Sequence, residues 1–199
     1  MSDVRAKRRL EVMGRIQAAA LDLFDARAFD RVTIEEIAAA AEVSAPTVYR
    51  HFGTKEQIVL WDEYDAALFH VLEERLRSRP LLDAVREAVF VPLNRVYTAD
   101  AGRILRRARL GNKEPAIRAA RDSNLGLFRT ALARTFITAE ACRDQLEADV
   151  IAGAVIATLQ TAIDHWSAAD GKEPLRRFIQ RAFRHLRGVG ARAKTRVKK

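Results

Sequence analysis

The 199 residues include five prolines, nine glycines and 49% hydrophobic residues, and this balance, with abundant Ala, Leu and Arg, indicates an all-α protein with a sizeable core. The single cysteine excludes an intrachain disulfide, and the N-terminus lacks the apolar segment of a signal peptide. The longest apolar run, 150–159, is too short to span a bilayer. We therefore expect a cytoplasmic protein without membrane contacts. The net charge of +9 suggests a polyanionic partner, yet the excess is C-terminal: basic and acidic residues number nine and nine in 1–60, 15 and 16 in 61–170, and 11 and one in 171–199.

Residues 1–9 are basic and lack a core pattern. They fit either a mobile arm that follows the minor groove of DNA through its charge or a plain disordered terminus. From about Leu10 to Ala26, apolar residues recur at helical spacing and predict a helix. Its apolar positions are Met13, Ile16, Ala20, Leu23 and Phe24.

The stretch 33–55 has the pattern of a helix-turn-helix motif. Thr33 is followed three residues later by a glutamate, which is the capping-box pattern at the start of a helix. Residues 42–43 form the turn, and Ser44 stands at the cap of a second helix with a proline in its first turn. Thr54 caps the helix that follows.

The outer residues of this motif suit a DNA groove. Their hydroxyls can bond to base edges or phosphates, and Arg50 can bind guanine through two hydrogen bonds. The alternative is a helical hairpin whose polar residues are only solvated. The expected DNA-binding residues are Thr33, Ser44, Ala45, Pro46, Thr47, Tyr49, Arg50, His51 and Lys55.

Residues 10–60, and FDRVTIEEIAAAAEVSAPTVYRHFGTKEQIV in particular, resemble the DNA-binding domain of the TetR (tetracycline-repressor-like) transcriptional regulators. Two residues, Ala28 and Glu42, stand where glycine is frequent in that family, so both positions must tolerate a turn conformation that glycine adopts more readily. Glu35 stands where some members place a base-reading arginine, which leaves base readout to the second helix of the motif.

With the helical patterns, the resemblance implies nine helices in a three-helix DNA-binding domain (1–54), a ligand-binding and dimerisation domain (55–188) and a basic disordered tail (189–199). Apolar periodicity predicts helices over 55–77, 81–97, 100–110 and 115–137. The first of these would run unbroken out of the DNA-binding domain. Pro92 is expected to bend the second and Gly111 to end the third, whose arginine cluster at 103–109 is interpreted as mainly a solvated face.

Two further helices are predicted over 139–168 and 174–188, the first apolar almost all round. We interpret them as a homodimer interface that forms a four-helix bundle with the symmetry-related pair, although both helices packing within one subunit is an alternative. The expected interface residues are Ala154, Ala157, Phe178, Ile179, Ala182, Phe183 and Leu186.

The sequence has no P-loop, no dinucleotide fingerprint, no zinc-ligand spacing and no nucleophile–base set, and its four histidines are scattered. We therefore expect no catalytic residues, metal or cofactor. A weaker resemblance to TetR members with acyl-CoA-like effectors implies an apolar cavity. Its candidate residues are Trp61, Tyr64, Asn94, Tyr97, Asn124, Phe128, Gln160 and Trp166.

The hypothesis is a repressor that a small apolar or acyl-CoA-like effector releases from palindromic double-stranded DNA. The alternative is a helical lipid or acyl carrier, or an enzyme, with an incidental N-terminal hairpin.

Overall fold

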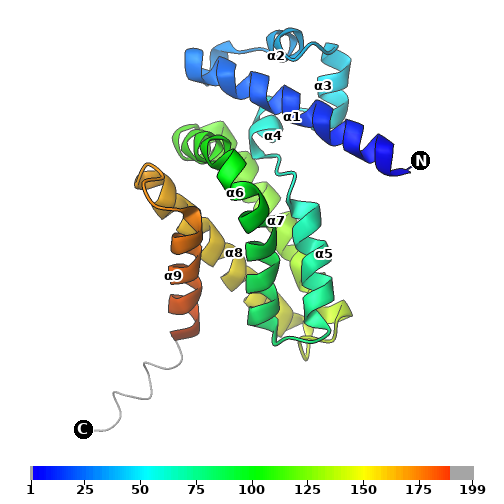
Figure 1. Ribbon diagram of the computed structural model, residues 1–199, viewed down its shortest axis with the longest axis vertical. Helices are drawn as coiled ribbons and strands as arrows, with labels where there is room; N and C mark the ends of the chain where they lie inside the picture. Colours follow the sequence, from blue (N-terminus) through cyan, green and yellow to red (C-terminus); the bar gives the residue numbers. More distant parts are fainter. Residues whose placement is uncertain (1, 189–199) are drawn as a thin grey trace. The chain divides into compact units, whose positions relative to one another are not determined.

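The computed structural model describes the backbone of residues 2–188 and the side chains of 4–91, 93 and 100–188. Within that part it contains nine α-helices, one 3-10 helix and no strand, as the all-α prediction required (Figure 1). The elements are α1 (Ser2–Ala26), η1 (Phe29–Arg31), α2 (Ile34–Ala40), α3 (Ala45–Phe52), α4 (Lys55–Leu60), α5 (Asp65–Leu76), α6 (Leu81–Lys113), α7 (Pro115–Thr138), α8 (Gln145–Ala168) and α9 (Leu175–Gly188). The tail 189–199 and the side chains of Asn94 and Tyr97 lie outside the described residues.

Backbone contacts divide the chain into two compact units. The first unit comprises the chain up to Glu63 together with Gly102–Asp122, and the second comprises Tyr64–Ala101 together with the chain from Ser123. The core of the first unit is built by α1 to α4, with Leu110 of α6 and Ile117 of α7 inserted among them. The helix-turn-helix unit therefore includes a late segment of the chain in addition to residues 1–54.

The helix α1 begins at Ser2, so the expectation that residues 1–9 precede the first helix is wrong for the described part. Nothing in the stretch after Ser2 stops a helix, because it contains neither glycine nor proline before Gly14. The apolar stripe itself is confirmed, since Met13, Ile16 and Ala20 are buried.

The unbroken helix expected over 55–77 is wrong. The structure has α4 and α5 separated by residues 61–64, because the backbone of Trp61 turns to an extended conformation (ψ 130°). The carbonyls at the end of α4 are bonded to side chains from elsewhere in the first unit instead of to the next helical turn.

The two helices expected over 81–97 and 100–110 form one helix, α6, which continues through Pro92 and Gly111. A Cβ at Gly111 would lie 3.5 Å from Nη1 of Arg121 and 3.9 Å from Cγ2 of Ile117. These are ordinary van der Waals distances, so the packing does not require glycine here, and Gly111 lies within α6 without ending it.

In the second unit α8 and α9 pack against each other, with Leu175, Ile179 and Phe183 of α9 buried. The helix α8 begins at Gln145, not at 139, because Glu140 (φ 52°) ends α7 and the Asp144 carboxylate caps α8 by accepting from the backbone N–H of Glu147 at 2.8 Å. The expected range of α9 is confirmed within one residue.

The helix α8 is apolar but largely uncovered in one subunit. Leu146 and Val150, one turn apart, are 74% and 61% exposed. By length and composition alone α8 would suit a membrane span, with a mean hydropathy of 1.5 over 18 residues. A helix covered by another protein surface meets the same criterion, so hydropathy does not distinguish the two.

Candidate nucleic-acid interface

The first helix of the motif, α2, begins with the expected capping box. The Thr33 hydroxyl accepts from the backbone N–H of Glu36 at 3.2 Å, and the Glu36 carboxylate accepts from the backbone N–H of Thr33 at 2.9 Å. Arg27 adds an ion pair to Glu36 at 2.8 Å, and its hydrogen bond lowers the pKa of that carboxyl group. The start of α2 is therefore fixed by contacts within ten residues of sequence.

The turn between α2 and α3 is a Schellman motif. Glu42 adopts a left-handed conformation (φ 54°), its N–H donates to Ala39 at 3.1 Å, and the N–H of Val43 donates to Ala38 at 3.0 Å. This confirms that Glu42 occupies a conformation glycine adopts more readily. Ala28 does not, because its φ is −57°.

The helix α3 presents a row of polar side chains to solvent. Ser44 stands at the N-cap but makes no capping hydrogen bond; its hydroxyl instead contacts that of Thr47 at 2.9 Å. Nη2 of Arg50 donates to the same Thr47 oxygen at 3.5 Å. Because these residues are three apart, the row follows one face of the helix. Pro46 is exposed beside it, whereas Ala45 is half-buried against the core.

Tyr49 and His51 lie near the C-terminal end of α3. The exposed Tyr49 hydroxyl donates to the Glu35 carboxylate at 3.3 Å, and the Glu35 charge raises the pKa of Tyr49. Burial lowers the pKa of the half-buried His51, and the charges of Arg50 and Arg9 lower it further. His51 is therefore neutral near pH 7 in the free protein.

Lys55 does not join the exposed set. Its ammonium donates to the backbone carbonyls of Phe29 at 2.6 Å and Val32 at 3.0 Å, and lies 4.6 Å from the Phe29 ring centre. The expectation that this ammonium faces phosphates is corrected by these contacts, which tie α4 to the 3-10 helix inside the first unit.

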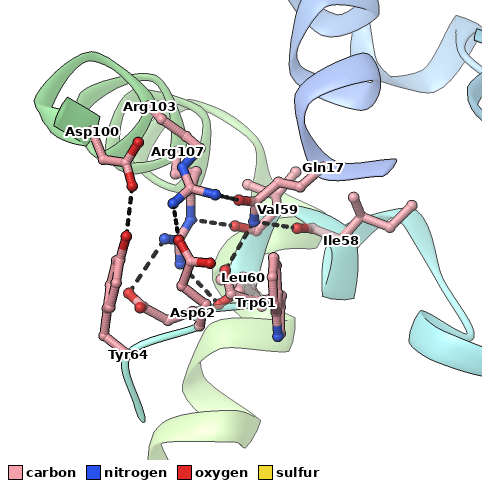
Figure 2. Close-up of polar contacts among 11 residues, drawn as sticks. Gln17, Ile58, Val59, Leu60, Trp61, Asp62, Tyr64, Asp100, Arg103 and Arg107 are labelled. Atoms are coloured by element: carbon pink, nitrogen blue, oxygen red, sulfur yellow. Dashed lines mark hydrogen bonds and ion pairs between the residues drawn. The ribbon is translucent and has the colours of Figure 1, made fainter. Parts of the chain in front are cut away.

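Two arginines of α6 and one glutamine of α1 surround the end of α4; we call Gln17, Arg103 and Arg107 the brace (Figure 2). Nε2 of Gln17 donates to the Ile58 and Trp61 carbonyls, both at 2.8 Å. Gln17 is fully buried.

Arg107 completes the end of α4 by donating from Nε to the Val59 carbonyl at 2.8 Å and from Nη2 to the Leu60 carbonyl at 3.1 Å. Arg103 bonds Gln17 at 3.3 Å and also the Glu63 carboxylate. All four last carbonyls of the helix and its cap thus find side-chain donors, which explains why α4 stops there.

Arg106 contacts the carboxylates of Asp22 and Asp25 on α1, each at 2.7 Å. The expectation that 103–109 is mainly a solvated face is therefore wrong. The sequence offered one signal for the brace: Gln17 interrupts the buried face of α1, four residues after Met13, where an apolar side chain is expected.

Family models match both parts of the chain. The model of the tetR family of bacterial regulatory proteins matches residues 16–60, and the model of the MftR C-terminal domain matches residues 79–190. The chain belongs to the TetR family.

Curated transcriptional regulators are similar over part of the chain. The HTH-type transcriptional regulator TcmR of Streptomyces glaucescens is 38% identical over 79 residues, which are 39% of this chain and 35% of TcmR. An HTH-type transcriptional repressor of Mycobacterium tuberculosis is 38% identical over 84 residues, which are 41% of this chain and 42% of that protein. The chain thus spans less than half the length of these relatives.

Two solved structures resemble most of the chain in fold. The FadR repressor of Thermus thermophilus, solved in complex with lauroyl-CoA, is 22% identical with a TM-score of 0.53, over 86% of this chain and 91% of that one. FadR of Bacillus halodurans is 16% identical with a TM-score of 0.59, over 89% of this chain and 95% of that one.

The candidate pocket residues whose side chains the structure describes belong to both units. Trp61 is half-buried and packs against the core of the first unit, with its ring centre 6.0 Å from that of Phe52. Trp166 is buried and donates from Nε1 to the Glu173 carbonyl at 2.9 Å. Their assignment to a pocket is corrected by these contacts.

The other described candidates belong to the second unit. The Tyr64 hydroxyl donates to the Asp100 carboxylate at 2.6 Å, Phe128 contacts Phe69 with ring centres 5.0 Å apart, and the Gln160 amide donates to Asp164 at 2.8 Å. Asn124 is half-buried.

The expected dimer residues separate into two sets. Ile179 and Phe183 are 3% and 2% exposed within one subunit, so their assignment to an intersubunit face is corrected. Ala157, Phe178, Ala182 and Leu186 instead line an open groove of about 490 Å³ between α8 and α9. Ala154 is half-buried on α8.

Proposed function

We propose that this TetR chain is a ligand-responsive, DNA-binding transcriptional regulator: a cytoplasmic homodimer, without enzymatic activity, that represses from a palindromic operator. The observation that carries the proposal is the polar row formed by Ser44, at the N-cap of α3, with Thr47 and Arg50 of α3, the second helix of a helix-turn-helix whose first helix begins with a capping box. Two such helices, one per subunit, would occupy successive major grooves about 34–36 Å apart.

The test is protection of an inverted repeat upstream of the chain's own gene. We expect specific protection and an affinity that falls steeply with salt, because phosphate contacts release counterions. A lipid carrier or an enzyme with an incidental hairpin would give neither result, and equal affinity for operator and random duplex would refute the proposal.

Within the interface, we propose that Tyr49 contacts a phosphate and that Arg50 contacts a base. Tyr49→Phe removes the exposed hydroxyl, which donates to Glu35 in the free chain, and should weaken binding to all duplexes alike, as expected for a phosphate contact. Arg50→Ala should relax discrimination at one base pair by about 1–3 kcal/mol. If the Arg50→Ala chain discriminates among a full set of single-base operator variants as the wild type does, Arg50 contacts the DNA backbone and not a base.

The dimer is proposed to form through α8 and α9. The groove between them is apolar, and the exposed side chains Leu146 and Val150 continue an apolar face along α8. A second copy would cover both in a four-helix bundle. Ala157→Arg at the exposed wall of the groove should give monomers in sedimentation experiments, and a persistent dimer would refute this face.

An apolar, acyl-CoA-like effector is proposed to release the DNA. Support comes from the lauroyl-CoA bound to the T. thermophilus FadR, a neighbour in fold. Tyr64, Asn94, Tyr97, Asn124, Phe128 and Gln160 remain the proposed pocket residues. The effector would act through its differential affinity for the DNA-bound and free states. Lauroyl-CoA should release operator DNA in a mobility-shift titration; no release at high micromolar concentration would refute this effector class.

A further inference from the structure

Several basic side chains of the first unit are paired with carboxylates inside it, so they contribute little charge to an interface with a polyanion. Carboxylates pair with Arg27, Arg31, Arg103, Arg106 and Arg107. The cations at the start of α1 differ: Arg5, Lys7, Arg8 and Arg9 are exposed, and no carboxylate with a described side chain lies within ion-pair distance of them. Four exposed cations without such a partner thus lie together at one end of α1.

Three of these cations share one face of the helix. Arg5, Arg8 and Arg9 stand at i, i+3 and i+4, whereas Lys7 projects from roughly the opposite side. Arg9 of this face lies near the C-terminal end of α3, because its charge acts on His51. Figure 1 shows α3 beside the N-terminal half of α1. The face that carries Arg9 therefore lies beside the end of α3 that carries Arg50.

We propose that Arg5, Arg8 and Arg9 form a phosphate-binding face, the α1 arginine face, which contacts the duplex backbone beside the base pairs that α3 reads. This inference rests on the proposed DNA binding. Arg5 and Arg9 are separated by about 6 Å along the helix axis, so their long side chains can reach neighbouring phosphates of one strand. Such contacts hold the register of the protein on DNA without reading sequence.

Because the arginines lie on a helix, we expect them to contact the DNA backbone and not to enter the minor groove. An α-helix with its side chains is about 10 Å wide, whereas the minor groove of B-form DNA is about 6 Å wide. A disordered arm could enter that groove, but residues described as the first turns of α1 cannot do so while they stay helical.

The experiment compares a triple variant, Arg5→Ala with Arg8→Ala and Arg9→Ala, with a control, Lys7→Ala, in the full-length chain. The wild-type chain is first shown to bind its operator specifically, which separates failure of this inference from failure of the proposed function. Affinities for operator and random duplex are then measured by fluorescence anisotropy over a series of salt concentrations.

We expect the triple variant to lose affinity for both duplexes by the same factor. Its log–log salt slope should become shallower by about 0.9 for each lost phosphate contact, hence up to about 2.7 for each subunit. Lys7→Ala should keep the wild-type slope. Circular dichroism should show the same thermal unfolding for all three proteins, because the substituted side chains are exposed.

Two outcomes overturn the inference. In the first, the triple variant keeps the wild-type salt slope, or Lys7→Ala reduces the slope by as much for each charge removed. Either result would show that the three arginines do not bind particular phosphates and contribute only general positive charge. In the second, exchanging A·T for G·C pairs beside the operator lowers wild-type affinity and leaves the triple variant unaffected, which would indicate minor-groove readout.

Discussion

The buried amide of Gln17 is expected to determine how firmly α4 is anchored in the DNA-binding unit. Gln17→Met keeps the length of the side chain and removes both donors to the carbonyls of Ile58 and Trp61. The Ile58 carbonyl then remains unpaired in the core, at a cost of about 1–3 kcal/mol, and the half-buried Trp61 carbonyl adds about 1 kcal/mol. Burial of the apolar methionine side chain offsets about 1 kcal/mol of this loss.

The net expectation is therefore a loss of about 2 kcal/mol in the free energy of unfolding of the first unit. The assay is urea unfolding followed by tryptophan fluorescence in a Trp166→Phe background, where Trp61 is the remaining tryptophan and reports on the first unit. The matched control is Gln160→Met, because the Gln160 amide bonds a side chain one turn away and leaves no carbonyl unpaired.

The control should lose less than about 0.5 kcal/mol, as is usual for side chains outside a buried hydrogen-bond network. If Gln17→Met stays within that margin, or if both substitutions cost the same, the carbonyls at the end of α4 are satisfied without Gln17. The account of why α4 stops at Leu60 would then be wrong.

Two further predictions use the same fluorescence assay. Thr33→Ala removes the hydroxyl of the capping box and should cost about 1–2 kcal/mol, whereas Thr33→Ser should be near neutral; equal costs would show that the hydroxyl does not act as the cap. His51 has a lowered pKa in the folded chain, so the unfolded chain binds the proton more tightly. Stability should be highest above about pH 6.5, the ordinary histidine pKa, and decline as pH falls below it; His51→Gln should flatten this decline.

Local patterns were sufficient for the helix-turn-helix itself. The capping box joins Thr33 to Glu36, and the cap of α4 joins Thr54 to Gln57. Both contacts span three residues, so the residue types at those spacings predict them without knowledge of the fold. The left-handed residue at the turn was also predictable, because Glu42 stands where the family uses glycine.

Two other left-handed residues escaped prediction. Glu140 and Asp170 end α7 and α8 in Schellman turns equivalent to that at Glu42. Glycine is the usual sequence signal for such turns, and at these positions an acidic residue takes its place. The helix expected to begin at 139 was consequently placed six residues too early.

Sequence alone determined the fold class, the motif and the family of this protein, because each depends on spacing within a few residues. Only the tertiary structure decided where α4 ends, that Lys55 faces inward, and which cations remain exposed for a partner. Those outcomes depend on donors and acceptors far apart in sequence: Gln17 reaches a carbonyl 41 residues away, and Arg107 reaches one 48 residues away. The sequence around a polar side chain does not indicate whether such a distant partner exists.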